Sequence, residues 1–318
     1  MDTVSAYWGT GSVVHFALLA SALLAGCLLA VQASVNLQLT KAVGTPYGAS
    51  TLQLGVATAL LAVLAVAVGA IGAVALVPSV EPWHLLGGLA SPLYITSGIL
   101  LFPRLGALAA AGLFVTGQTL ASLALDGFGL LGIPRHPLSA GVVVGVLAVL
   151  AGITVVIRAQ DAGLAPGKRV GWIGLGVVAG AVLPVQGAVN AALRADLHAP
   201  VTVALISFVV ATLAISVVLL LMRASDRTPA PRLAPLRGMP WWGWLGGVCA
   251  AVYVTATFML MPEIGAATTV VLTVTGQQLA SAVVDHGGLF RMPRRRFTPA
   301  RAAGLALLVA GSLLVQLF

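Results

Sequence analysis

Residues 115–122 read VTGQTLAS, and residues 274–281 read VTGQQLAS. The likeness extends well beyond these octapeptides, because residues 86–137 align without gaps with residues 245–296. LGG begins both segments, Tyr94 matches Tyr253, and Asp126 matches Asp285. A further matching pair, AVQASVNLQL at 30–39 and PVQGAVNAAL at 184–193, lies ahead of each segment. The chain is therefore predicted to contain two copies of one unit.

The composition indicates a membrane protein. Of the 318 residues, 59% are hydrophobic and only 8% are charged, whereas soluble domains carry roughly 25% charged residues. The net charge of +8 does not point to nucleic acid, because the basic residues lie in short loops between apolar runs. The lipid bilayer is thus the expected partner. Cys27 and Cys249 each lie in an apolar run without a ligand-like neighbour, and no metal or other cofactor is expected.

Ten apolar segments are long enough to cross a bilayer, which takes about 20 helical residues. They cover residues 13–38, 48–76, 83–102, 106–125, 138–157, 170–194, 200–222, 241–261, 265–284 and 299–317. Residues 1–159 and 160–318 would then each hold five spans. The sequence predicts an all-α integral membrane protein with ten transmembrane helices arranged as two inverted five-helix repeats.

The basic residues divide unequally between the two sides that these spans define. One side has only two basic residues, Arg135 and Arg194. The other side has Lys41, Arg104, Arg158, Lys168, Arg169, Arg223, Arg227, Arg232, Arg237, Arg291, Arg294, Arg295, Arg296 and Arg301. Short cytoplasmic loops are enriched in Lys and Arg. We therefore expect a multi-pass protein of a bacterial plasma (inner) membrane, with both termini extracytoplasmic.

An odd number of spans in each copy inverts the second copy relative to the first. The loop charges agree, since PRLG at 103–106 falls on the basic side and its copy PEIG at 262–265 on the other. Inverted repeats of secondary transporters place a solute site near the bilayer midplane and give alternating access. The repeat therefore indicates a transporter of a small-molecule solute and not an enzyme, acting as a monomer or a homodimer.

The PVQGAVNAAL helix after a basic loop and the repeated TGQ-x-LAS-x-x-x-D-x-x-G-L element resemble the drug/metabolite transporter superfamily, in its YdcZ-like branch. The resemblance implies a fused ten-helix chain that moves solutes without ATP through a cavity between its halves. Small multidrug resistance relatives carry a membrane-embedded glutamate in their first helix. Gln32 and Gln186 occupy the corresponding helices here, with no carboxylate near either, which argues against proton/cationic-drug exchange of that kind.

Eight polar residues of the spans are expected to bind the solute: Gln32, Asn36, Gln186, Asn190, Tyr94, Tyr253, Thr96 and Thr255. The glutamine and asparagine of each pair are four residues apart and share a helix face. Because a lipid-facing amide is costly, they should face protein or a water-filled cavity. Hydrogen bonding between helices is the alternative for the amides, and an interfacial aromatic belt is the alternative for the tyrosines.

Asp126 and Asp285 each end the fourth span of a copy. A carboxylate at a helix C-terminus opposes the macrodipole, so a cationic partner is expected. Arg135 and Arg294 follow nine residues later, which predicts the ion pairs Asp126–Arg135 and Asp285–Arg294, with gating or proton coupling as the alternative role.

Three glutamines of the fourth spans, Gln118, Gln277 and Gln278, lie among small residues. Such a pattern is typical of close helix–helix packing, so these glutamines are interpreted as packing residues. They are left out of the predicted solute site.

The leading functional prediction is a secondary transporter of a small polar metabolite, neutral or zwitterionic. One alternative is a multidrug exporter for hydrophobic compounds. The other is a polytopic membrane enzyme acting on lipid-linked substrates, which the sequence disfavours because it shows no clustered carboxylates, His-rich site or Ser/His pairing.

Overall fold

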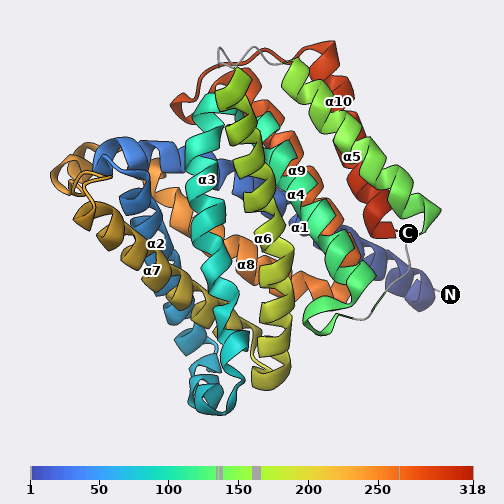
Figure 1. Ribbon diagram of the computed structural model, residues 1–318. Helices are drawn as coiled ribbons and strands as arrows, with labels where there is room; N and C mark the ends of the chain where they lie inside the picture. The colour runs from blue at the N-terminus through green and yellow to red at the C-terminus, as the bar shows by residue number, and fades with distance from the viewer. Residues whose placement is uncertain (1, 134, 136–138, 160–165, 265, 318) are drawn as a thin grey trace.

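The protein folds as a bundle of long α-helices (Figure 1). The computed structural model describes residues 2–133, 135, 139–159, 166–264 and 266–317, and no β-strand occurs among them. The helices are α1 (Asp2–Val43), α2 (Pro46–Ala67), α3 (Ala90–Leu105), α4 (Ala107–Phe128), α5 (Ala140–Arg158), α6 (Pro166–Leu197), α7 (Pro200–Ala224), α8 (Leu245–Ile264), α9 (Ala266–Gly287) and α10 (Pro299–Leu317).

Nine helical segments of the described chain are long and apolar enough to cross a membrane. The tenth helix is α9, which carries the polar residues Gln277, Gln278 and Asp285; all three are buried inside the protein. The ten predicted spans thus correspond one to one with α1–α10, and the all-α transmembrane architecture is confirmed.

The second and third spans differ most from their predicted boundaries. Helix α2 ends at Ala67, and Gly69 then adopts a positive φ of 70°, which glycine adopts without steric cost. Two 3-10 helices follow, Ala70–Ser79 and Pro82–Leu89, and the second leads directly into α3. The chain therefore turns after α2 and re-enters the bundle through a tighter helix than predicted.

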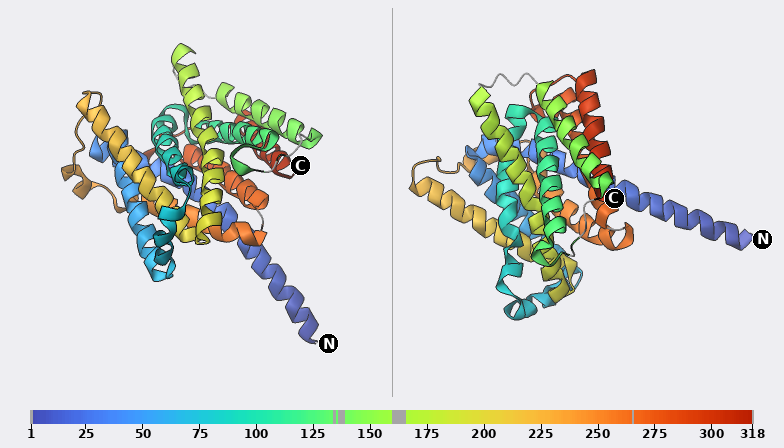
Figure 2. Two further views of the ribbon diagram at one scale, coloured as in Figure 1. Left: turned by 60° about the horizontal axis from the view of Figure 1, so that its bottom comes forward. Right: turned by 45° about the vertical axis from the view of Figure 1, so that its right-hand side comes forward.

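The two halves interlock. Helix α1 packs against α8 and α9 of the second half, and its counterpart α6 packs against α3 and α4 of the first. Helix α2 packs with its counterpart α7, and α5 packs with α10 along one side of the bundle (Figure 1). The first turns of α1 extend beyond the bundle (Figure 2). Each half thus contributes its first helix to the other half.

Four glycines lie at two close crossings that the repeat relates to each other. Gly117 and Gly180 lie where α4 crosses α6, and their counterparts Gly276 and Gly26 lie where α9 crosses α1. A Cβ atom added to any of them would lie 1.9–2.1 Å from a backbone carbonyl oxygen of the facing helix. Such contacts bring helix backbones together in membranes. They hold α6 and α1, the helices with the repeated Gln/Asn pairs, against the opposite half.

One end of the bundle carries most of the basic residues. Lys41, Arg104, Arg158 and Arg223 lie in the last turns of α1, α3, α5 and α7, and Arg291 follows α9. We call this the basic end and the opposite one the distal end. Odd-numbered α-helices end at the basic end, and even-numbered ones begin there.

Candidate functional site

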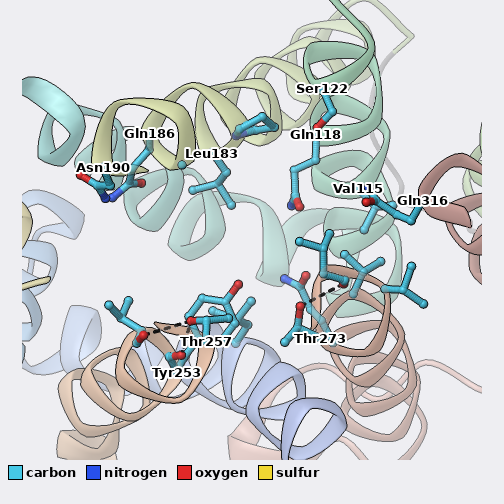
Figure 3. Close-up of a pocket in the computed structure, with 18 of the residues that line it drawn as sticks. Val115, Gln118, Ser122, Leu183, Gln186, Asn190, Tyr253, Thr257, Thr273 and Gln316 are labelled. Atoms are coloured by element: carbon cyan, nitrogen blue, oxygen red, sulfur yellow. Dashed lines mark hydrogen bonds between the residues drawn. The ribbon is translucent and has the colours of Figure 1, made fainter. Parts of the chain in front are cut away.

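A cavity of about 450 Å³ lies between two walls of the bundle. Figure 3 shows α4 and α6 on one side and α8 and α9 on the other. Small-molecule sites have volumes of roughly 300–1,000 Å³, so the cavity can hold a small solute. Its polar lining comprises Gln118, Thr119, Ser122, Asp126, Gln186, Asn190, Ser207, Tyr253, Thr257, Thr273, Gln277, Ser312 and Gln316.

The cavity lies in the distal half of the bundle. Most of its lining comes from the C-terminal parts of α4, α6, α8 and α10 and from the N-terminal parts of α7 and α9, all of which lie at the distal end. Ile133, beyond the end of α4, and Gln316, near the end of α10, border it. The cavity therefore extends from the middle of the bundle toward the distal end.

A second, much smaller pocket occupies the inverted position. Its volume is about 10 Å³, and its lining is Leu29, Gln32, Ala33, Asn36, Tyr94, Ile95, Gly98 and Phe114. In the sequence alignment these residues correspond to Leu183, Gln186, Gly187, Asn190, Tyr253, Val254, Thr257 and Thr273, which all line the large cavity. Equivalent residues of the two repeats thus line an open cavity toward the distal end and a collapsed pocket toward the basic end. The parts of the bundle around them are called the open, or distal, half and the collapsed, or basic, half.

Tyr94 closes the collapsed half. Its hydroxyl oxygen accepts a hydrogen bond of 2.9 Å from Nε2 of Gln277 in α9, and its ring packs on Phe114 with ring centroids 4.7 Å apart. The corresponding residues in the open half are Tyr253 and Gln118, which lie on opposite walls of the cavity (Figure 3). The Tyr94–Gln277 contact therefore has no equivalent across the open cavity in the described part of the chain.

Within the described part of the chain, several buried polar atoms of α1 and α9 lack a hydrogen-bond partner. They include Oε1 of Gln32, Oδ1 of Asn36, both amide atoms of Gln278, Oγ of Ser281 and Oε1 of Gln277, which also lines the large cavity. A buried polar group without a partner costs about 1–3 kcal/mol. The region around the small pocket is therefore polar as well as closely packed.

The repeated Gln/Asn pairs have divided roles in the structure. Asn36 and Asn190 join helices: Asn36 Nδ2 donates to Gln53 Oε1 at 2.5 Å, and Asn190 Nδ2 donates to Ser207 Oγ at 3.3 Å. Gln186 lines the large cavity while its Nε2 donates to Ser91 Oγ at 2.9 Å. Gln186 and Asn190 thus both line the large cavity and both bond to neighbouring helices, whereas Asn36 joins helices beside the small pocket.

The glycines of the repeated LGG sequences accommodate these asparagines. An added Cβ on Gly87 would lie 2.2 Å from Oδ1 of Asn190, and one on Gly246 would lie 2.1 Å from Oδ1 of Asn36. Each asparagine oxygen therefore rests against a glycine of the other half. Only glycine leaves room for this contact.

The remaining predicted residues are separated. Tyr253 lines the large cavity and Tyr94 the small pocket. Thr96 is buried and lies 3.1 Å, hydroxyl to hydroxyl, from Ser50. Thr255 lines neither pocket, whereas Thr257, two residues later, lines the large cavity. On an α-helix residues four apart share a face and residues two apart do not, so Thr257 lies on the face of Tyr253 and Thr255 does not.

A polar stripe on α4 was missed as part of the site. Gln118, Ser122 and Asp126 are spaced by four residues, so they share one face of α4, and all three line the large cavity. Asp126 lines the same cavity as Gln186, which the sequence did not predict. Helix α4 crosses α6, which brings together residues far apart in sequence. The repeated Q-x-x-x-S-x-x-x-D spacing was the signal in the sequence.

Asp285 pairs with a different arginine from the predicted one. Its carboxylate accepts hydrogen bonds from the backbone N–H groups of Ala107 (2.7 Å) and Leu108 (3.2 Å) and forms an ion pair with Arg301 of α10. Arg294 instead donates through Nε to the carbonyl oxygen of His286 at 3.0 Å. The turn after α9 causes this difference, because Gly288 and Phe290 take φ values of 63° and 55° and direct Arg294 back to the helix end.

The same turn recurs after α4. Arg135 donates through Nε to the carbonyl oxygen of Gly127 at 2.9 Å, and within the described residues no ion pair joins it to Asp126. Both arginines thus cap the end of the fourth helix of their half. The predicted loop-tying role is performed through backbone carbonyl oxygens and not through the carboxylates.

Comparison with known proteins places these features in a family. The sequence profile of the family described as "Putative inner membrane exporter, YdcZ" matches residues 17–155 and, a second time, residues 171–314. No curated protein matches the chain. One solved structure, described as "Crystal structure of protein", superposes with a TM-score of 0.56 at 21% sequence identity, over 93% of this chain and 96% of that chain. At that identity the likeness shows the fold alone.

The two profile matches coincide with the two inverted five-helix halves of the structure. They cover most of the chain, and both halves line the large cavity: α4 of the first half and α6 of the second form one wall, and α8 and α9 of the second half form the other. The protein is thus a multi-pass membrane transporter, and it belongs to the YdcZ-like branch of the drug/metabolite transporter superfamily in its fused, two-repeat form.

Proposed function

We propose that the protein is a secondary transporter that moves a small polar solute, neutral or zwitterionic, by alternating access. One observation carries the proposal: a cavity of about 450 Å³ in the distal half and its inverted counterpart of about 10 Å³ in the basic half. If the two halves exchanged conformations, the first would close and the second would open. A solute held at Gln186 would then be exposed to the other side of the membrane.

The hydrogen bond between Tyr94 and Gln277 suggests how the exchange is stabilised. In the exchanged state the corresponding pair, Tyr253 and Gln118, would meet across the distal half and close it. Only one of the two bonds forms at a time, so each state is held by one tyrosine–glutamine contact. In each pair the tyrosine and the glutamine belong to different repeats of the chain. Closure at the basic end is therefore linked to opening at the distal end.

The lining favours a solute recognised by hydrogen bonds. Amides such as Gln118 and Gln186 both donate and accept, and the hydroxyls of Ser122, Tyr253 and Thr257 do the same. Apolar residues of α6, α8 and α9 fill the remaining wall. A few oriented polar groups on an apolar wall are typical of small-molecule sites.

The direction of transport is proposed from the loop charges and from the family. The basic end would face the cytoplasm under the positive-inside rule, so the cavity of this conformation would open to the outside. The family is described as an exporter. The conformation would then be the one from which an exported solute leaves.

Solute flux through liposomes tests this function. The purified protein is screened for small polar metabolites that raise its melting temperature, and each hit is assayed for uptake in proteoliposomes. We expect saturable flux that falls by about tenfold or more in Gln186→Leu, because an amide that binds solute contributes about 1.5 kcal/mol. Val185→Leu, the neighbouring residue exposed outside the cavity, is the matched control. Unchanged flux in Gln186→Leu, alone or combined with Gln32→Leu, would contradict the assignment.

Removing the Tyr94 hydroxyl should open the basic half. Tyr94→Phe leaves the Gln277 amide without its buried partner, so the closed state loses about 1–2 kcal/mol and its opening becomes about tenfold more frequent. The measurement is the rate at which a water-soluble maleimide labels Ser281→Cys, which is fully buried here, in a background with Cys27→Ala and Cys249→Ala.

Two further variants check the interpretation of that labelling rate. Tyr47→Phe changes a partly buried tyrosine of α2 outside both pockets and should leave the rate unchanged. Tyr253→Phe should lower the rate, because it weakens the state in which the basic half is open. Equal rates in all variants would show that the Tyr94–Gln277 bond does not hold the basic half closed.

A further inference from the structure

The inverted repeat places one polar stripe in two different environments. On α4 the stripe is Gln118, Ser122 and Asp126, and it lines the open cavity. On α9 it is Gln277, Ser281 and Asp285, whose exposed fractions are 1%, 0% and 0%. The buried stripe therefore shows what surrounds such an aspartate when its half of the pathway is closed.

In the closed half, Asp285 keeps a cation against it. Its carboxylate already accepts two backbone N–H hydrogen bonds at the start of α4, and Arg301 of α10 completes the site with an ion pair. Arg301 is 2% exposed. A buried carboxylate is costly unless it is both paired and hydrogen-bonded, and here the chain itself supplies the positive charge.

The open half lacks that cation. The residue that corresponds to Arg301 in the alignment of α5 with α10 is Val142. Asp126 takes part in no ion pair within the described part of the chain. Among the described residues that line the cavity, Asp126 is also the only one with a charged side chain. Its negative charge therefore faces the space where a solute would bind.

Closing the distal half would bury Asp126 as Asp285 is buried now. Without an arginine at position 142, that closure leaves a carboxylate whose charge must be neutralised from outside the chain. An ammonium group can do this, since it carries one positive charge and three N–H donors. The hydroxyl of Ser122, one turn away on the same face, would accept a further hydrogen bond. The amide of Gln118 lies two turns, about 12 Å, from Asp126 and would contact another polar group of the solute.

We propose that Asp126 is a binding site for a protonated amine of the transported solute, which supplies at the distal end the charge that Arg301 supplies at the basic end. This inference rests on the proposed transport function and narrows its solute class to ammonium-bearing, zwitterionic compounds. It also makes closure of the distal half depend on solute, whereas closure of the basic half depends on the chain alone.

Paired probes test the proposal on the purified full-length protein. Small primary amines, each matched with the alcohol of the same carbon skeleton, are titrated near neutral pH, and affinity is measured from the ligand-induced rise in melting temperature. We expect at least one amine to bind about tenfold or more tightly than its alcohol, since hydrogen bonds to charged groups contribute about 1.5–3 kcal/mol. Asp126→Asn should remove this preference, and Asp126→Glu should retain it.

Two more variants separate a local charge effect from a loss of structure. Asp226→Asn makes the same change at an exposed aspartate between α7 and α8 and should leave amine binding unchanged. Val142→Arg supplies the missing guanidinium and should weaken amine binding by about tenfold, whereas Val142→Gln should not. Comparing Val142→Arg with Val142→Gln tests the effect of a positive charge at position 142 and leaves Asp126 unaltered.

Three outcomes would overturn the amine site. The first is equal binding of amines and alcohols by the unaltered protein, and the second is an amine preference that survives Asp126→Asn. The third is that Asp126→Asn changes only the response of binding to pH, which would mean that the cation at Asp126 is a proton. If uncharged solutes are transported while amines are ignored, the transport function stands and only the amine site fails. If no solute of any class is transported, the transport function itself fails.

Discussion

Replacing Gly180 with leucine should unfold the protein or prevent its insertion. A Cβ atom at this position would lie 2.1 Å from the carbonyl oxygen of Phe114, and the facing Gly117 is equally crowded. The backbones of α4 and α6 would have to separate, and the cavity wall that they form would be lost. We expect a loss of stability above about 3 kcal/mol, beyond the usual range for overpacking, measured by thermal unfolding in detergent.

The matched control for this change lies on the same helix. Gly174 also belongs to α6, is exposed, and has no atom within 4 Å of an added Cβ. Gly174→Leu should therefore keep the melting temperature of the unaltered protein. Gly276→Leu, at the inverted crossing of α9 and α1, should be as damaging as Gly180→Leu. A well-folded Gly180→Leu protein with native flux would contradict the close crossing.

Removing one partner of the Asp285–Arg301 pair should have the second large effect. Both side chains are buried, so Arg301→Ala leaves an unpaired carboxylate, and Asp285→Ala leaves an unpaired guanidinium and uncaps α4. Breaking a buried pair in this way costs about 3–5 kcal/mol. Burial also lowers the pKa of the nearby Arg295 guanidinium, while Asp285 opposes that shift, so losing Asp285 leaves two arginines without their counter-charge.

The more exposed ion pair of the structure provides the control. His84 and Asp196 form a pair at the distal end with side-chain exposures of 13% and 36%. Asp196→Ala should change stability by about 1 kcal/mol or less, as exposed pairs do. The double variant Asp285→Leu with Arg301→Leu should recover part of the loss, because no buried charge then remains. A single Arg301→Ala as stable as Asp196→Ala would mean that Asp285 does not depend on Arg301.

Local sequence determined the helices and their relation. Runs of about 20 apolar residues predict spans, and the matching of 86–137 with 245–296 predicts the inverted halves, because an odd number of spans reverses the direction of the second copy. The cost of exposing the Gln186 amide to lipid also led to the prediction that it faces protein or a cavity. These properties depend on hydrophobicity and spacing along the chain, which are readable without knowing what each helix touches.

Pairing between distant helices was not readable in the same way. Asp285 was expected to bind Arg294, nine residues away, yet the turn at Gly288 directs Arg294 to a carbonyl oxygen and leaves Asp285 to Arg301. Asp126 was expected to pair with Arg135, yet Arg135 bonds to the carbonyl oxygen of Gly127 and Asp126 lines the large cavity. Each of these outcomes depends on which helices cross, and that depends on glycine contacts between segments far apart in sequence.

The sequence by itself determined that two nearly equivalent halves face each other in opposite directions, because hydrophobic runs and an odd span count are properties of the chain alone. It did not determine which half is open. VTGQTLAS and VTGQQLAS differ by one residue. Both Gln118 and Gln277 border the large cavity, yet Gln277 is 1% exposed and bonded to Tyr94, whereas among the described residues no such bond joins Gln118 to Tyr253. Only the tertiary structure decided this, because the contact that closes the smaller pocket, between Tyr94 and Gln277, joins the first repeat to the second.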